Sequence, residues 1–252
     1  MAEEGAGGRL AGKVLVAVTS GVSTGALGVH AVDPFLDDWQ RTGLVVVTAV
    51  IATGTSSATA VGEYRRKQAE SRREDADFFL RGARWAVHDL TGLDVRDLGV
   101  ACYAVRRPRL APWAAPRLRR IGRVRSTRRP AASGVRWRPG VGVVGVCVRD
   151  GRAVVRDVEA DERPWLEATR RDWESVVPEH VKIGLSYDEF RRVRGKYHVV
   201  LAVPIIQEQG ARSRVVGAVA LDGPSGSYDA LWTQDVRDVL TGATVNLRRF
   251  VL

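Results

Sequence analysis

HVVLAVPI (198–205) and RVVGAVALD (214–222) are the two stretches that decide the fold of this 252-residue chain. Both are short apolar runs rich in Val, which is typical of buried strands. Three more runs with strand character precede them, at 98–105, 118–126 and 152–158, in a region punctuated by Gly and Pro. The C-terminal part of the chain is therefore predicted to contain a sheet.

Helices are predicted on both sides of these strands in the sequence. In 231–250, Trp232 and Leu240 fall on one helical face with other apolar residues, and the capping candidates Ser227 and Asp229 precede them. A sheet with helices at both ends of its sequence predicts an α+β domain.

The segment 63–90 is predicted to be one long helix. It contains no Pro, and Ala76, Phe79, Ala83, Val87 and Leu90 recur at three- to four-residue spacing. We expect a stalk helix whose apolar face packs either on the downstream domain or on the same helix of a second protomer. A homo-oligomer through this helix is thus left open.

Two segments without Asp, Glu, Lys or Arg, 14–32 and 43–62, are candidates for a transmembrane helical hairpin. At 1.5 Å per residue, each just covers a hydrocarbon core of about 30 Å. The small residues Gly21 and Gly25 in the first segment would suit close helix packing, within the hairpin or between protomers. The alternative is a pair of buried helices in a soluble domain.

The flanking charges predict the orientation of this hairpin. Arg9 and Lys13 precede the first span and a basic cluster follows the second, whereas the connector holds mainly Asp. The positive-inside rule then places both termini in the cytoplasm and the protein in the cell inner (plasma) membrane. If 1–31 is instead a cleaved signal peptide, the second span still leaves the remainder cytoplasmic. The expected domains are a tail (1–12), the hairpin (13–62), the stalk (63–95) and the C-terminal domain (96–252).

The charge of the chain is concentrated in one arginine-rich block. The 39 Lys and Arg against 29 Asp and Glu give a net charge of +10, yet 98–149 alone holds thirteen Arg and no acidic residue. With only two Cys, a disulfide-stapled module and a thiolate zinc cluster are excluded. A wholly disordered chain is excluded as well, because 45% of the residues are hydrophobic.

Ten arginines of this block are candidates for contact with an anionic surface. The inner lipid leaflet is the favoured partner. Nucleic acid is disfavoured because no binding motif for it is present, and a merely solvated edge stays open. The candidates are Arg106, Arg107, Arg109, Arg117, Arg119, Arg120, Arg123, Arg125, Arg128 and Arg129.

Motifs for catalysis, metal binding or cofactors are weak. GVGVVG at 140–145 spells the dinucleotide fingerprint, but RWRP precedes it at 136–139 and no βαβ alternation follows. By propensity, 143–149 reads as a strand. The four His are isolated, so no metal site is expected. Because the sequence has no P-loop, no GxSxG elbow and only two Cys, no cofactor and no enzyme activity is expected either.

The C-terminal domain resembles the GAF family of small-molecule sensor domains. The resemblance implies an antiparallel sheet in which the last two strands form a hairpin, the final helix packs on the sheet, and 143–149 is a short helix that ends at Gly151. The sequence departs from the family in two ways: the connection 106–117 is long and arginine-rich, and neither a chromophore-ligating cysteine nor a cyclic-nucleotide signature is visible. The ligand class therefore does not carry over. The residues that carry the resemblance are GVGVVG at 140–145, Asp150-Gly151, LAVPI at 201–205, VVGAVAL at 215–221 and the closing helix 232–250.

In the GAF family the ligand pocket lies between the sheet and the segment that joins the third and fourth strands, here 157–198. That segment is rich in aromatic residues, which suit a pocket but could equally build a core under a long loop. We expect a membrane-anchored, non-enzymatic cytoplasmic sensor that binds a small molecule or a partner protein. The alternative is an assembly platform or membrane effector that binds no small ligand. The pocket candidates are Trp165, Trp173, Tyr187, Tyr197 and His198.

Overall fold

The computed structural model describes 38–108, 111, 113–126, 134–210 and 212–252, with only the backbone described for 38–61, 65 and 69. The chain divides into two compact units, Met1–Ser71 and Arg72–Leu252. In the first unit the described residues belong to helix α2 (Asp38–Thr91), which continues into the second unit.

No helix within the described residues is long and apolar enough to cross a membrane. Of the two predicted spans, 14–32 lies outside the described residues. The other, 43–62, lies in the part of α2 where the structure describes little besides helical backbone.

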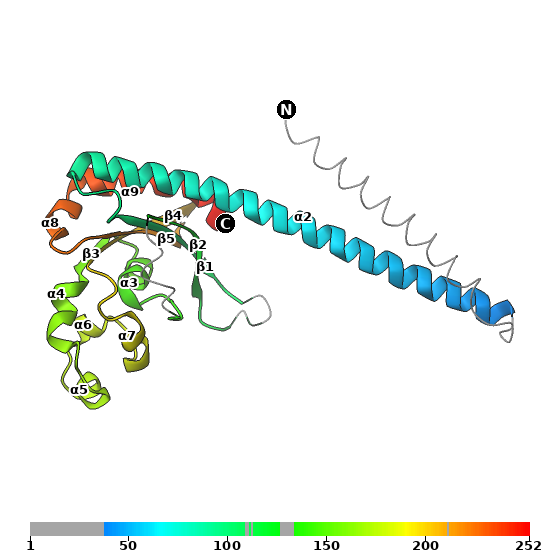
Figure 1. The fold of residues 1–252 in the computed structure, drawn as a ribbon, viewed down its shortest axis with the longest axis horizontal. Helices are drawn as coiled ribbons and strands as arrows, with labels where there is room; N and C mark the ends of the chain where they lie inside the picture. The colour runs from blue at the N-terminus through cyan, green and yellow to red at the C-terminus, as the bar shows by residue number, and fades with distance from the viewer. Residues whose placement is uncertain (1–37, 109–110, 112, 127–133, 211) are drawn as a thin grey trace. The chain divides into compact units, whose positions relative to one another are not determined.

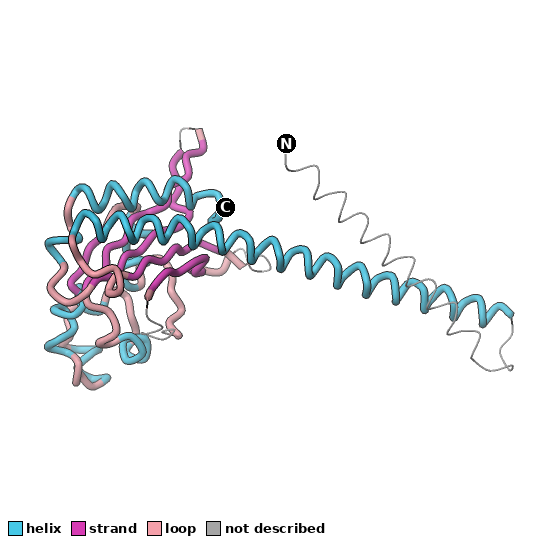
Figure 2. The backbone as a smooth tube through the Cα atoms, turned by 45° about the horizontal axis from the view of Figure 1, so that its top comes forward, coloured by secondary structure: helices cyan, strands magenta, loops and turns pink. Residues whose placement is uncertain are grey.

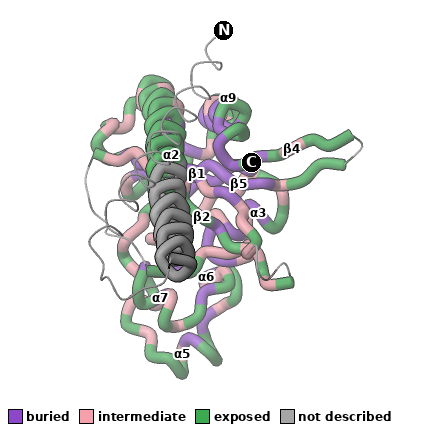
Figure 3. The backbone as a smooth tube through the Cα atoms, turned by 90° about the vertical axis from the view of Figure 1, so that its right-hand side faces the viewer, coloured by how far each residue is buried: buried purple, intermediate pink, exposed green. Residues whose placement is uncertain are grey.

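The second unit is built on a five-stranded antiparallel sheet of order β2-β1-β5-β4-β3. All five strands predicted from the sequence are present, so the α+β class is confirmed. The strands are β1 (Gly99–Arg106), β2 (Arg117–Arg125), β3 (Val154–Asp157), β4 (Val199–Gln209) and β5 (Arg212–Gly223). The two stretches quoted first, β4 and β5, pair with each other as a hairpin, and its far end is exposed (Figure 3).

One face of the sheet packs against two long helices, the 72–91 part of α2 and α9 (Gln234–Val251) (Figures 1 and 2). Ala76, Ala83 and Val87 of the predicted stripe are buried there, together with Leu80, whereas Leu90 at the end of the stripe is 50% exposed. The apolar face of the stalk helix therefore packs on its own domain. The short α8 (Tyr228–Leu231) precedes α9.

The other face of the sheet is covered by short helices, which Figure 1 shows on the side away from α9. Those that follow α3 form, with their connections, a segment that we call the cover (158–198). The covering elements are α3 (Gly142–Asp150), α4 (Val158–Glu162), the 3₁₀ helix η1 (Arg163–Trp165), α5 (Arg170–Ser175), α6 (Glu179–Lys182) and α7 (Tyr187–Val193).

The α3 segment is a helix, as the resemblance implied, and not the strand that its local propensity predicts. Cys147 and Val148 are buried against β4 and β5, and this tertiary packing outweighs the β-propensity of the Val residues. The helix ends at Gly151, whose φ of 66° is left-handed and whose N–H donates to the Cys147 carbonyl at 2.9 Å.

Candidate ligand-binding site

A cavity of about 70 Å³ lies between the second face of the sheet and the helices that cover it. Strands β1, β2, β4 and β5 supply its floor and one side, while α3, α4 and the connections around α6 and α7 supply the rest. Its lining residues are Ala101, Tyr103, Arg120, Arg123, Trp137, Gly142, Val143, Val144, Val158, Glu162, Ile183, Leu185, Val193, Tyr197, Val200, Ala220 and Asp222.

The floor of the cavity consists of small side chains on neighbouring strands. Ala101 of β1 pairs with Ala220 of β5, and both are buried and line the cavity. Ala220 in turn pairs with Ala202 of β4. Because a methyl group fills little of the space between a sheet and its covering helices, this row of alanines leaves room that larger side chains would occupy.

Two arginines and two tyrosines give the cavity its polar wall. Arg120 and Arg123 come from β2, Tyr103 from β1 and Tyr197 from the connection before β4. Burial raises the pKa of the Tyr103 phenol to about 12, with a further contribution from Tyr197, while Arg120 and Arg123 act in the opposite direction. Tyr103 is therefore protonated at neutral pH and can donate a hydrogen bond beside two guanidinium groups.

An ion pair between Arg125 of β2 and Asp222 of β5 closes the end of this wall, with 13% and 12% of the two side-chain surfaces exposed. The pair spans β1 at Gly99, which pairs with both residues. A Cβ on Gly99 would lie 2.6 Å from each carboxylate oxygen of Asp222. The missing side chain of Gly99 is therefore what allows this carboxylate to lie across the strand.

Glu162, on α4, is the most deeply buried ionisable residue of the cover, with 7% of its surface exposed. Its Oε2 accepts a hydrogen bond from the Gly195 N–H at 3.1 Å. Burial raises the pKa of this carboxyl to about 7, and the nearby Asp161 adds to the shift. At neutral pH, both the protonated and the ionised form are therefore populated.

The N-terminus of α3 also borders the cavity, through Gly142, Val143 and Val144. Its N-cap residue, Val141, provides no side-chain hydrogen bond, and the first turn contains no acidic side chain. The Gly142 N–H donates to the Ile183 carbonyl at 2.8 Å, but no side chain of the N-cap or first turn offsets the partial positive charge of this helix end. Gly142 has a φ of +65°, and a Cβ there would lie 2.5 Å from Cζ3 of Trp137, so glycine lets the indole pack against the helix start.

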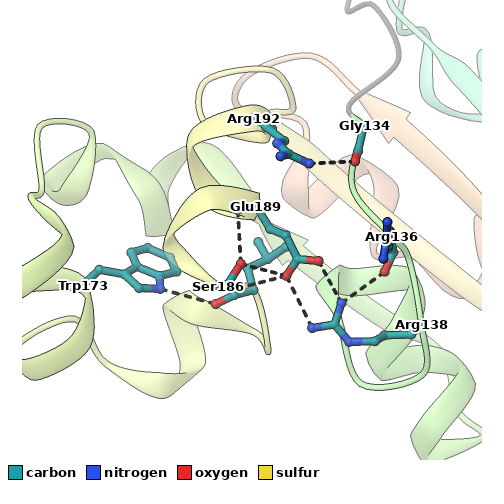
Figure 4. Close-up of polar contacts among 8 residues, drawn as sticks. Gly134, Arg136, Arg138, Trp173, Ser186, Glu189 and Arg192 are labelled. Atoms are coloured by element: carbon teal, nitrogen blue, oxygen red, sulfur yellow. Dashed lines mark hydrogen bonds and ion pairs between the residues drawn. The ribbon is translucent and has the colours of Figure 1, made fainter. Parts of the chain in front are cut away.

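Polar contacts hold the covering segments together (Figure 4). Arg138, just before α3, donates from Nη1 to Oε1 of Glu189 on α7 at 2.8 Å. Arg192 of α7 donates to the Gly134 carbonyl at 3.1 Å, and the Trp173 indole N–H to the Leu185 carbonyl at 3.3 Å. The cavity wall at Leu185 is thereby tied to both α5 and the segment before α3.

Of the five predicted pocket residues, the cavity lining includes Tyr197 and none of the others. Trp173 is buried in the core of the cover and stacks on Phe190 with 4.2 Å between ring centroids. Trp165 packs against the same cluster, and the Tyr187 hydroxyl donates to the Ala168 carbonyl at 3.2 Å.

The fifth candidate, His198, lies away from the cavity. Its Nδ1 is 2.9 Å from Oε2 of Glu159, and nearly half of its side chain is exposed. Ligand contact by any of these residues stays a prediction.

The ten candidate arginines do not all face solvent in the structure. Arg107, Arg117 and Arg119 are exposed. Arg106 donates to the Leu252 carbonyl at 3.3 Å. Arg120, which is also exposed, and the half-buried Arg123 line the cavity, and Arg125 is paired with Asp222. The remaining candidates, Arg109, Arg128 and Arg129, lie outside the described residues.

Sequence reasoning did not single out Ala101, Ala220, Glu162 or Asp222. One available signal was the alternation of small and large apolar residues in AVALD, which marks one face of this strand as shallow. Within the described residues, no cluster of three or more His, Cys, Asp or Glu could hold a metal ion.

No family model and no curated protein matches this chain. Among solved structures, a GAF domain/HD domain protein from Geobacter sulfurreducens is 14% identical, with a TM-score of 0.39 over 72% of this chain and 96% of that one. NreA from Staphylococcus aureus, mutated in its nitrate binding site, is 15% identical, with a TM-score of 0.33 over 66% and 89%.

An IclR family transcriptional regulator from Brucella abortus is 16% identical, with a TM-score of 0.31 over 92% of each chain. All three TM-scores are below 0.5, so the nitrate binding of NreA and the other properties of these proteins are not evidence about this chain. The sheet order and the helices on both faces are consistent with a GAF-like fold.

Proposed function

We propose that the Arg72–Leu252 unit is a non-enzymatic binding module of a sensor, and that its ligand is a small organic anion held in the cavity. The observation that carries this proposal is the presence of Arg120, Arg123 and Tyr103 on one wall above a floor of alanines. Guanidinium groups bind carboxylates strongly, and the alanine methyls suit a short apolar tail.

The size of the cavity limits the ligand to a few atoms. At about 70 Å³ it has roughly half the volume of the 150 Å³ apolar cavity that accommodates benzene. Acetate and propionate are therefore the matching probes. With at most about 1.5 kcal/mol of binding free energy per non-hydrogen atom, acetate binds with a Kd of tens of micromolar at best.

Two features support binding over catalysis. The thiols of Cys102 and Cys147 are buried, and burial raises the pKa of each to about 12, so neither is a thiolate nucleophile at neutral pH. The polar side chains of the cavity wall are mainly Arg and Tyr, which orient an anion without supplying a nucleophile.

Calorimetric titration of the full chain with acetate, and with its neutral isostere acetamide, tests this function. Acetate should bind and acetamide should not. The variant Arg123→Gln should weaken acetate by about tenfold or more, because a charge-assisted hydrogen bond is lost. The matched control is Arg119→Gln, on the same strand but outside the cavity lining, which should bind as the wild type does. Equal affinity for acetate and acetamide would contradict an anion site.

For the exposed arginines outside the cavity lining, Arg107, Arg117 and Arg119, we propose an anionic lipid surface as the partner. Trp113 is 83% exposed in the connection between β1 and β2, which is flanked by Arg107 and Arg117. An exposed Trp among basic residues suits the headgroup region of a bilayer. We also retain the proposal that the chain is anchored in the inner membrane with both termini cytoplasmic.

Vesicle binding and membrane fractionation test this partner. Sedimentation should show binding to vesicles that contain phosphatidylserine, loss of that binding in high salt, and weakening by Trp113→Ala. Equal binding to neutral vesicles would rule out the electrostatic contact. A full-length chain that stays in the supernatant of lysed cells without detergent would rule out the anchor.

An assembly platform is the second candidate function, favoured by two aromatic side chains. Phe78 and Trp85 lie seven residues apart on α2 and are 71% and 51% exposed. A period of seven is the spacing of helix–helix contacts between protomers. Light scattering should then give a dimer or larger species that Phe78→Ser with Trp85→Ser dissociates. A wild-type monomer would exclude the platform.

A further inference from the structure

Glu162 places a carboxyl group in the wall of a cavity that otherwise suits an anion. Arg120, Arg123 and the start of α3, which has no side-chain cap, all favour negative charge in the cavity. An ionised Glu162 would repel a bound carboxylate, whereas a protonated Glu162 would offer it an O–H donor. The protonation state of this one side chain therefore decides whether it opposes the ligand or binds it.

Building on the function proposed above, we propose that the cavity binds its anion together with one proton, carried by Glu162, whose carboxyl O–H donates to the anion. The proton passes from hydronium in the solvent to a carboxylate oxygen of Glu162, no other bond forms or breaks, and the proton returns to solvent when the anion leaves.

The surroundings of Glu162 make it the group that responds near neutral pH. Burial raises the pKa of its carboxyl to about 7, and the Gly195 N–H donates to Oε2, so that Oε1 can face a ligand. Asp161 on the same helix is paired with Arg156, with 2.6 Å between Oδ2 and Nη2. The other charged or titratable groups of the cavity wall are Tyr103 on β1, Arg120 and Arg123 on β2, Tyr197 before β4 and Asp222 on β5.

None of these other groups is expected to change its charge on anion binding. Tyr103 has a pKa of about 12, and arginines keep their charge throughout the neutral range. Asp222 is the ion-pair partner of Arg125. Proton uptake on anion binding would therefore come from Glu162.

The affinity of the cavity for the anion should fall as the pH rises. Below about pH 6 Glu162 is already protonated, so the affinity is constant. Above about pH 8 each anion must bring a proton, so the Kd rises by about tenfold per pH unit. If an ionised Glu162 instead held the ammonium group of a zwitterion such as glycine, the affinity for that ligand would rise with pH.

Calorimetry of the full chain with acetate at pH 6, 7 and 8, in two buffers that differ in ionisation enthalpy, measures both the Kd and the number of protons taken up. Acetate stays ionised throughout this range. The wild type should show a Kd about tenfold higher at pH 8 than at pH 6, with proton uptake rising towards one per acetate. Glu162→Gln, which keeps an N–H donor and cannot titrate, should have a Kd that is flat with pH and close to the wild-type value at pH 6.

The matched control is Glu167→Gln, an exposed carboxyl outside the cavity lining, which should keep the wild-type pH dependence. Proton uptake by the wild type needs no variant, so the test stands even if Glu162→Gln fails to fold. Acetate binding without proton uptake, or a Kd that falls with pH, would overturn the role of Glu162 and leave the anion site intact. Absence of acetate binding at every pH would instead overturn the proposed function.

Discussion

The two faces of the sheet are built from alternate residues of the same strands, yet they differ in what they do. In β5, Leu221 faces α2 and α9 and is fully buried in the larger core, while its neighbour Ala220 faces the cavity. In β1, Val100 and Ala101 are divided in the same way. Large side chains such as Leu221 fill one face and stabilise the domain, whereas Ala101 and Ala220 leave the other face shallow at that point, and the space above them is the proposed ligand site.

The largest effect is expected for Gly99→Ala, on the shallow face. The added Cβ would lie 2.6 Å from both carboxylate oxygens of Asp222 and would force it away from Arg125. Breaking a buried pair of this kind destabilises a protein by about 3–5 kcal/mol. Urea unfolding measures the loss. Gly242→Ala on α9, where a Cβ meets nothing within 4 Å, should stabilise slightly, and equal effects of the two changes would contradict the role of Gly99.

Leu221→Ala tests the packed face. Removing a fully buried leucine from the core beneath α2 and α9 should lower the free energy of unfolding by about 2–5 kcal/mol. Acetate affinity of the folded variant should stay as in the wild type, because the side chain points away from the cavity. A large loss of affinity without a loss of stability would show that the two faces are not separate in function.

The pH dependence of stability tests the burial of Glu162. Its pKa is about 7 in the folded chain against 4.5 as a free side chain, so the folded state binds more protons between these values. The wild type should therefore lose stability, relative to Glu162→Gln, as the pH rises from about 4.5 through 7, by on the order of 3 kcal/mol in total. Urea unfolding of both proteins at pH 5 and pH 8 gives the difference. If the stability difference between the wild type and Glu162→Gln is the same at pH 5 and pH 8, the carboxyl lies in solvent.

The smallest effect on stability is expected for Ala220→Val, the neighbour of Leu221 on the opposite face. Its two extra methyl groups enter the empty space of the cavity, so the free energy of unfolding should change by less than about 1.5 kcal/mol. Acetate binding, followed by calorimetry, should nevertheless be lost because the floor is filled. Full retention of acetate affinity would place the ligand elsewhere.

The strands and the long helices could be predicted from the sequence because their patterns are local. The Val-rich apolar run at 198–205 and the apolar spacing in 63–90 each indicate one element without knowledge of its neighbours. The helix 142–150 could not be predicted from propensity, since its Val residues favour a strand and only packing against β4 and β5 reverses that preference.

The cavity depends on pairing between distant segments. Arg125 and Asp222 are 97 positions apart and meet only because β2 and β5 flank β1 at Gly99. The aromatic residues of 157–198 suggested a pocket by composition, but most of them build the core of the cover, as Trp173 and Phe190 do. Composition of a segment does not indicate which side chains face the sheet.

Nuclear Overhauser contacts between bound acetate and alanine methyl groups test the central claim most directly. In the full-length chain labelled at alanine methyls, the acetate methyl should show contacts to Ala101 and Ala220 at pH 6, and Arg123→Gln should weaken them. Contacts only to alanines outside the cavity lining, or none at acetate concentrations in the millimolar range, would contradict the assignment of this cavity as an anion site.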